Sequence, residues 1–328
     1  MRLVHPHPGS TSPKGLVIAG ALAMAVSVIS CGSESGPSAS RMGAGLAEPD
    51  QGGFVYLDLR SAHHWSNLRQ PERGELELRA MFVHHWGGDR EDVAQQLGLR
   101  LDEPSLTRGT CARGADLVAL PLGDFDEDAG EVSVELMDAG ALLFGLEGRS
   151  ELVGGEPYPE VLPNVSGHHY HRVLPLATKS VSTRRVSVVG LGGRDVSAFE
   201  LTGVRGPVDL RWTTVGGWSP ADGPAVVSAR DPLVLRWAPG QPRFGTLVRL
   251  RWPARGARPA GELVCRPGTP GRLTVPRAWL RRIPITGAGL EATLTVETTA
   301  RSSAEGPLPD GVVMCVTQSD SVTLQVVR

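Results

Sequence analysis

The chain has 328 residues and a formal net charge of −2, a length that suffices for two domains. It contains 41 glycines and 26 prolines, and valine, leucine and threonine alternate with polar residues throughout. This composition disfavours a mainly helical protein and predicts an all-β fold, in which short strands are joined by Gly/Pro turns.

The N-terminus has the pattern of a bacterial export signal. Arg2 and Lys14 precede a run of apolar and small residues from 16 to 30, which is too short for a transmembrane helix of about 20 residues. Residues 28–31 resemble the lipobox of bacterial lipoproteins, whose cysteine is lipidated after cleavage. We therefore predict a signal peptide over residues 1–30 and a lipid on Cys31. The alternative is an ordinary secreted protein with a chance cysteine at the cleavage position.

Residues 31–50 are rich in Ser, Gly and Ala, which predicts a flexible tether between the lipid and the folded part. The predicted localisation is therefore the cell envelope, with the membrane contacted through the lipid anchor. Gly32, and not Asp, follows Cys31. Because nothing here argues for retention in the inner membrane, we expect the outer membrane.

Residues 51–202 are predicted to form a first, β-sandwich-like domain. Residues 89–101 have some helical character but are predicted to be a loop. The expected strands cover residues 53–60, 75–86, 115–122, 130–137, 141–146, 170–176, 185–191 and 197–202.

Residues 203–328 are predicted to form a second β-sandwich, of the immunoglobulin or fibronectin type, because seven or eight short strands fit into about 125 residues. Residues 276–283 could form one helical turn, since proline favours the first helical position. The expected strands cover residues 208–213, 233–237, 246–252, 262–265, 271–275 and 292–298, with two more within 312–327.

Three cysteines remain once Cys31 is assigned to the lipid. Export places Cys111, Cys265 and Cys315 in an oxidising compartment, which predicts one disulfide. Cys265 and Cys315 each lie in a predicted strand of the second domain, so we expect them to pair. Cys111 would then be a free thiol.

Several short motifs are spread over most of the mature chain. They are residues 109–111, 128–134, 170, 197–199, 235–237, 263–265 and 271–276. These motifs resemble those of a family of uncharacterised secreted lipoproteins of the myxobacterial type. The resemblance implies no activity, and the absence of the family's further cysteines from the first half supports an unpaired Cys111.

Histidines form one candidate metal site. The tripeptide His-His-Trp occurs at 63–65 and at 84–86, and further histidines cluster near residue 170. Residues two apart on a strand share a face, so His169 and His171 could bind zinc or copper together with His84. The alternative is that these histidines are surface or structural residues.

An acidic run forms a candidate calcium site. Asp124, Asp126, Asp128 and Glu135 occupy positions 1, 3, 5 and 12 of a calcium-loop pattern, but Ala129 stands at the position that requires glycine. An acidic turn that leads into a strand explains the same residues without a metal.

The charge is unevenly distributed. Residues 51–202 hold 23 acidic and 14 basic side chains, whereas residues 203–328 hold 9 acidic and 16 basic ones. The basic part could face an anionic surface such as an envelope polysaccharide, or its arginines could simply solvate exposed strands. The arginines of residues 249–258 lack a nucleic-acid recognition motif, so no nucleic-acid partner is expected.

No catalytic motif was found, neither a nucleophile elbow nor an H-E-x-x-H pair. The sequence therefore predicts a non-enzymatic binding or structural module of the cell envelope, with no cofactor. A metal-binding lipoprotein that uses the histidine clusters is the alternative. A hydrolase of carbohydrate or lipid, which converging carboxylates in a deep pocket would favour, is a third possibility.

Overall fold

The computed structural model describes residues 51–328 except for 66–72, 100, 102–105, 119–131, 148, 160–161, 163, 177–181, 219–224, 240, 242–243, 255–259 and 286–288. All described residues belong to one compact unit, Ala47–Arg328. The predicted signal peptide, the lipidation position Cys31 and the tether lie outside the described residues.

The described part of the chain is built almost entirely from strands. Its elements, in chain order, are β1 Gln51–Trp65, β2 Arg73–Trp86, α1 Arg90–Gln96, β3 Cys111–Arg113, α2 Gly114–Val118, β4 Ser133–Leu136, β5 Leu142–Glu147, β6 Arg149–Val153, β7 Glu156–Pro157, β8 Val165–Leu176, β9 Ser182–Gly190, β10 Phe199–Val204, β11 Arg211–Val215, β12 Ala225–Ser228, β13 Leu233–Ala238, β14 Gly245–Trp252, β15 Gly261–Cys265, β16 Arg272–Val275, α3 Arg277–Leu280, β17 Leu290–Ala304 and β18 Val312–Val327.

The strands form one large sheet and two small ones. The main sheet has 11 strands in the order β3-β15-β14-β17-β18-β1-β2-β4-β8-β7, with β12 paired to β18. The small sheets have the orders β10-β9-β5-β6 and β11-β13-β16. The all-β prediction is confirmed. The main sheet contains strands from both predicted domains, residues 51–202 and 203–328. The division into two separate sandwiches and the immunoglobulin-like form of the second stay predictions.

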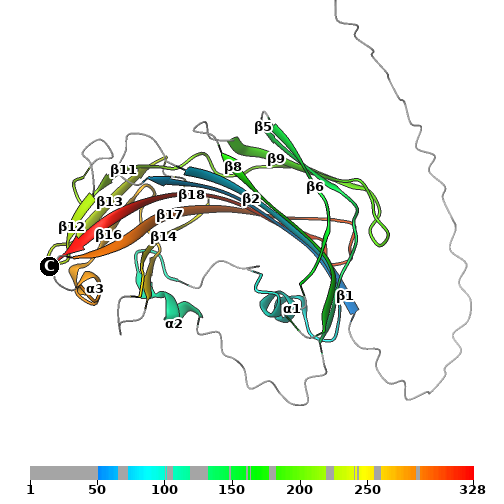
Figure 1. Ribbon diagram of the computed structural model, residues 1–328, viewed down its shortest axis with the longest axis horizontal. Coiled ribbons are helices and arrows are strands. Elements are labelled where there is room, and N and C mark those ends of the chain that lie inside the picture. Colours follow the sequence, from blue (N-terminus) through cyan, green and yellow to red (C-terminus); the bar gives the residue numbers. More distant parts are fainter. Residues whose placement is uncertain are drawn as a thin grey trace, which may run out of the picture. The chain divides into compact units, whose positions relative to one another are not determined.

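The two small sheets pack on one face of the main sheet, and α1 and α2 lie on its other face (Figure 1). One core joins the main sheet to β11-β13-β16 and is centred on residues such as Leu235, Val296 and Leu324. A second core joins it to β10-β9-β5-β6 and contains Phe82 and Phe144. This sandwich-like packing follows from strands whose apolar residues recur at every second position.

Two predicted elements differ from the structure. Residues 115–118, expected within a strand, belong to the helix α2, and residues 312–327, expected as two strands, form the single long strand β18. The pairing of β18 with β17 runs without interruption from Val312 to Val326, so no turn separates two halves. The single helical turn expected near residue 277 is confirmed as α3.

The prediction of a loop at residues 89–101 is also wrong, because residues 90–96 form α1. The side chain of Asp89 accepts a hydrogen bond from the backbone N–H of Asp92 at 2.9 Å, which caps the helix. Val93 and Ala94 are buried against the main sheet in a third core. The cap and the burial of one helical turn therefore stabilise α1. The segment is too short to show a clear helical periodicity in its sequence.

Replacing Asp89 by alanine removes this cap. We expect the free energy of unfolding, measured by urea denaturation, to fall by about 1 kcal/mol. Asp89→Asn keeps a capping oxygen and should stay close to the wild type. Equal losses in the two variants would show that the cap does not stabilise the helix.

Candidate anion-binding site

One face of the main sheet is polar where β1, β18, β17 and β14 run side by side. On β1, Tyr56, Asp58 and Arg60 alternate with Leu57 and Leu59, which belong to the second core. The registers of the neighbouring strands place further polar residues on the same face. These residues are Arg249 and Arg251 on β14, Glu297, Thr299 and Arg301 on β17, and Cys315 and Thr317 on β18.

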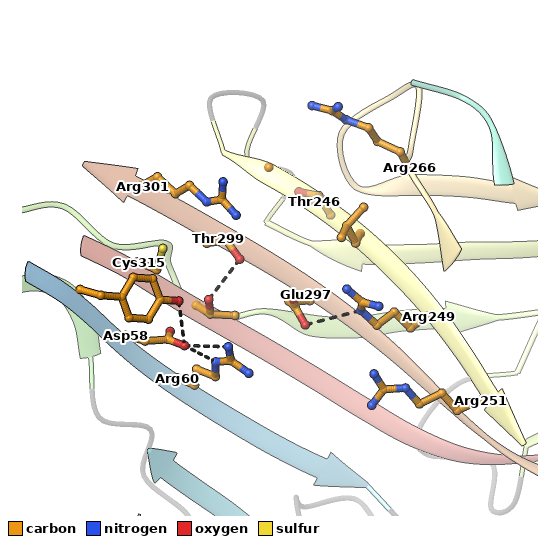
Figure 2. Close-up of a pocket in the computed structure, with 14 residues that line it drawn as sticks. Asp58, Arg60, Thr246, Arg249, Arg251, Arg266, Glu297, Thr299, Arg301 and Cys315 are labelled. Atoms are coloured by element: carbon orange, nitrogen blue, oxygen red, sulfur yellow. Dashed lines mark hydrogen bonds and ion pairs between the residues drawn. The ribbon is translucent and has the colours of Figure 1, made fainter. Parts of the chain in front are cut away.

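These side chains line a cavity of about 170 Å³, more than ten times the roughly 10–15 Å³ that one water molecule needs. We call it the arginine cavity. Arg266, which directly follows β15, completes its wall. In Figure 2, guanidinium groups from several strands surround the cavity, with Glu297 beside Arg249 and Asp58 beside Arg60.

The arginine cavity carries an excess of positive charge. Among the described residues, its lining has five arginines and two carboxylates, Asp58 and Glu297. A third carboxylate, Glu262, accepts hydrogen bonds from Arg249 and Arg251. Among the described residues around the cavity, arginines therefore outnumber carboxylates. Such an excess attracts anions, most strongly where the surroundings exclude water.

Arg249 is the most deeply buried of the arginines in the described lining. It is 6% exposed, and its Nη1 donates to Glu262 Oε1 at 3.3 Å. Its Nε lies 3.8 Å from Glu297 Oε2, which is beyond hydrogen-bonding distance, and has no hydrogen-bond partner among the described residues. A buried charged donor without a partner costs free energy. Arg249 also lines the cavity, where its positive charge favours a bound anion.

Asp58 and Arg60 form an ion pair at the other side of the cavity. Arg60 Nη2 lies 2.6 Å from Asp58 Oδ2, and Asp58 is almost fully buried. Burial opposes the charge of Arg60, but the Asp58 carboxylate outweighs it and raises the pKa of the guanidinium. Burial, together with Asp58, raises the pKa of Tyr56, so the phenol stays protonated. The Tyr56 hydroxyl donates to Asp58 Oδ2 at 3.5 Å, whereas Arg60 has further N–H groups besides those that face Asp58.

Cys315 lies in the same wall and is a buried free thiol. Burial raises its pKa above the ordinary value, with a lesser opposing effect from Arg301. The thiol is therefore neutral at physiological pH, whereas the nucleophile in cysteine chemistry is the thiolate.

The disulfide joins Cys111 to Cys265, so the predicted Cys265–Cys315 pairing is wrong and Cys111 is not free. β3 lies at the edge of the main sheet with Cys111 directly opposite Cys265. Two strands, β14 and β17, separate β15 from β18. At about 4.8 Å per strand, Cys315 is then roughly 14 Å from Cys265, too far for a disulfide.

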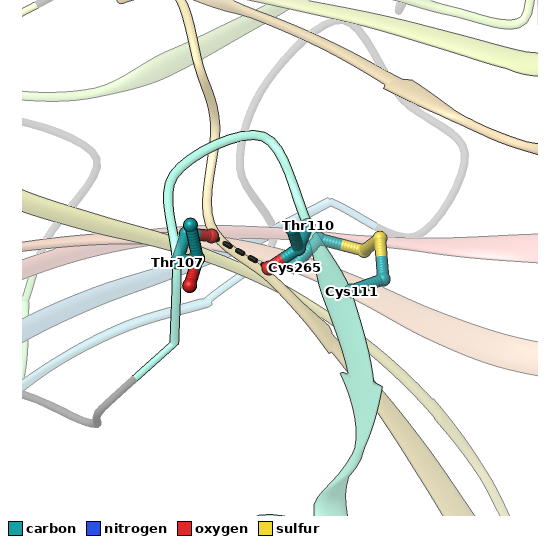
Figure 3. The surroundings of a disulfide bond; sticks show 4 residues. All are labelled: Thr107, Thr110, Cys111 and Cys265. Carbon is teal, nitrogen blue, oxygen red and sulfur yellow. Dashed lines mark hydrogen bonds between the residues drawn. A yellow bond between two sulfur atoms is a disulfide. The ribbon is translucent and has the colours of Figure 1, made fainter.

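The disulfide ties the turn that precedes β3 to β15 (Figure 3). In this turn the Thr110 hydroxyl donates to the carbonyl of Thr107 at 2.6 Å. The backbone N–H of Arg266 donates to Thr110 O, and its Nη1 donates to Leu106 O at 3.2 Å. Residues 106–111 therefore fix the backbone and the side chain of Arg266.

The histidines of the predicted metal site are not brought together. His171 lies opposite Arg79 in the β2–β8 register, while His84, five residues further along β2, lies opposite Glu135 of β4. His171 Nε2 is 3.1 Å from Glu77 Oε1, and His169 packs edge-on against the Tyr158 ring. Within the described residues, no three His, Cys, Asp or Glu side chains form a group that could hold a metal ion.

The predicted calcium ligands Asp124, Asp126 and Asp128 lie outside the described residues, so that site stays a prediction. Glu135 is described and lies in β4, paired with His84 of β2 and with Ser166 of β8. This agrees with the alternative in which the acidic run leads directly into a strand.

Carboxylates that converge in a deep pocket would favour a hydrolase. In the described lining of the arginine cavity, the two carboxylates instead lie beside arginines. Asp58 is bound by Arg60, and Glu297 lies beside Arg249. Sequence reasoning noted Arg249 and Arg251 only as part of a basic cluster and missed Arg60, Arg266 and Arg301. The available signal was the run of polar residues at alternate positions of otherwise apolar strands.

None of the helices in the described part of the chain has the length and apolar character needed to cross a bilayer.

Comparison with known proteins gives no family for this chain. No family model matches the sequence, and no curated protein is similar to it. Among solved structures, the yeast delta-COP-I mu-homology domain aligns over 85% of this chain and 99% of its own, at 8% identity and a TM-score of 0.24. Values this low carry no argument about fold or function.

Proposed function

We propose that this protein is a non-enzymatic lipoprotein of the cell envelope that binds an anionic ligand in the arginine cavity. The observation that carries the proposal is the excess of arginines in the cavity. Its described lining has five arginines and two carboxylates, and Arg249 is the buried arginine among them. A bound anion would offset the excess charge.

The charge distribution along the chain supports the same ligand class. Four of the five cavity arginines belong to the basic region 203–328, and Arg60 alone comes from the acidic region 51–202. An anionic polysaccharide or another anionic component of the envelope fits the localisation predicted from the N-terminus. The lipid on Cys31 would hold the cavity near such a component.

Replacing Arg249 tests the proposal. We expect the full chain, purified in detergent, to bind inorganic phosphate in isothermal titration calorimetry at low ionic strength. A charge-assisted hydrogen bond contributes about 1.5–3 kcal/mol. Arg249→Gln should therefore weaken phosphate binding by at least tenfold.

The matched control is Arg230→Gln, because Arg230 is exposed in the turn after β12 and lies outside the cavity lining. It should bind phosphate as the wild type does. Wild-type protein that does not bind phosphate, or Arg249→Gln protein that binds it with unchanged affinity and an unchanged melting temperature, would rule out the cavity as an anion site.

A further inference from the structure

The small sheet β11-β13-β16 has one buried face and one exposed face. The buried face belongs to the first core, to which it contributes residues such as Leu235 and Leu273. The residues that alternate with these point away from the main sheet. Among them, Arg211 on β11, Arg236 on β13 and Arg272 on β16 are all exposed. We call this exposed face the outer basic face.

The three arginines of the outer basic face lie close together. Arg236 pairs directly with Arg272, and side chains opposite each other on antiparallel strands are about 4.5–5.5 Å apart at Cβ. Arg211 pairs with Ala238, which is two residues from Arg236 on the same strand. It is therefore a diagonal neighbour of Arg236, at roughly 7–8 Å. The three arginines form a row that crosses the strands.

This row of arginines has no counter-charge on its own sheet. The strands β11, β13 and β16 contain neither Asp nor Glu. The ion pairs that arginines form within the described residues involve neither Arg236 nor Arg272. Like charges directly opposite each other on neighbouring strands destabilise a sheet. An anion that binds to both guanidinium groups relieves this repulsion, so the outer basic face favours anionic partners.

The outer basic face is separate from the arginine cavity. On β14, Arg249 lines the cavity, whereas Val248 and Leu250 on either side of it pack in the first core together with the small sheet. The main sheet therefore lies between the two sites. The cavity has a volume of about 170 Å³, which suits a small anion, while the exposed strands of the outer basic face can accommodate a long one.

We propose that the outer basic face binds an acidic polysaccharide, a chain of sugars that carries carboxylates at regular intervals. The carboxylates pair with Arg272, Arg236 and Arg211 across the three strands. The exposed hydroxyls of Thr213 and Thr274 on the same sheet bind sugar hydroxyls. A polymer with repeated charges matches a row of arginines, because contacts that are weak one by one reinforce each other when they are linked.

An anionic lipid surface is the other class of partner that exposed arginines attract. Helices that lie on a membrane also bury apolar side chains such as Trp, Phe and Leu at the headgroup boundary. Among the described residues of the outer basic face, the apolar ones are Val234 and Ala238. This composition favours a hydrated polymer over a bilayer.

Binding of the full chain, purified in detergent, to immobilised polygalacturonate at low ionic strength tests the proposal. Biolayer interferometry gives the dissociation constants of the wild type and of the double variant Arg236→Gln/Arg272→Gln. We expect the wild type to bind and the double variant to bind at least fivefold more weakly. Fully methyl-esterified polygalacturonate, which has the same backbone without its charges, should not bind detectably.

The matched control is Arg185→Gln/Arg194→Gln, which removes the same number of charges from exposed positions outside this sheet. It should bind polygalacturonate within twofold of the wild type. Because Arg236→Gln/Arg272→Gln removes a pair of like charges, its melting temperature should equal or exceed that of the wild type. Weaker binding by this variant is then not a consequence of unfolding.

The outcomes separate this inference from the proposed function. Arg249→Gln alters the cavity alone, so it should bind polygalacturonate as the wild type does, even where it loses phosphate. Wild-type protein that does not bind polygalacturonate, equal losses in the two double variants, or a loss in Arg249→Gln would each overturn the inference. Binding to phosphatidylglycerol vesicles that depends on Arg236 and Arg272, without binding to polygalacturonate, would assign the face to a membrane instead.

Discussion

Replacing Cys111 and Cys265 together by alanine is expected to lower the free energy of unfolding by about 5 kcal/mol on the chain-entropy account of disulfides. The bridge joins residues 154 positions apart, so its loss releases a long loop in the unfolded chain. It also frees β3, a strand of only three residues at the edge of the main sheet. Urea denaturation of the variant and the wild type measures the difference.

Cys315→Ala is the matched control for this experiment. Cys315 is buried and forms no disulfide, so removing its thiol should cost no more than about 1–2 kcal/mol. If Cys315→Ala caused a loss as large as that of the double variant, the pairing Cys265–Cys315 expected from the sequence would be supported instead, because both variants would then break that bridge.

The second large effect concerns Asp320 of β18, which is fully buried on the core side of the main sheet. Its carboxylate accepts hydrogen bonds from Trp65 Nε1 and, at 2.8 Å, from the backbone N–H of Trp212. It therefore joins β1, β18 and the small sheet that contains β11. Burial raises the pKa of Asp320 to about 7, although these hydrogen bonds and Arg211 oppose the shift.

We expect this group to make the protein less stable as the pH rises. Between pH 3.8, the ordinary pKa of the side chain, and about pH 7, the folded protein retains a proton that the unfolded chain has released. The free energy of unfolding therefore falls across this window, and above pH 7 the loss is complete. A shift of this size corresponds to about 4 kcal/mol. Urea denaturation at a series of pH values between 5 and 8.5 measures the part of this loss above pH 5, about 2.7 kcal/mol.

Asp320→Asn isolates the contribution of Asp320. An amide stays neutral at every pH, but it offers only one acceptor for two donors, so the variant should be less stable than the wild type at pH 5. At pH 8 this difference in the free energy of unfolding should shrink or reverse, because Asp320 has then lost its stabilising proton in the wild type. His63, whose pKa is lowered mainly by burial, titrates with the opposite sign and is present in both proteins, so it cancels in the difference. A difference that does not change with pH would contradict the raised pKa.

Part of the candidate site could be read from the sequence. The alternation of Tyr56, Asp58 and Arg60 with apolar residues identifies a strand with one polar face, and the basic character of region 203–328 indicates an anionic partner. Asp320 could also have been found. It is a polar residue among Val316, Val322 and other apolar residues at alternate positions of one strand, and such a residue needs a buried partner.

The sequence by itself determined the all-β character of the described chain and the apolar face of each strand. Both follow from side chains that alternate with period two, a property of each strand alone. Tertiary structure alone decided which strands are neighbours. The parallel pairing of β1 with β18, some 250 residues apart, brings Arg60 near Arg249 and Arg301, and the pairing of β3 with β15 places Cys111 opposite Cys265. Such choices depend on packing summed over the whole sheet, and no local pattern records them.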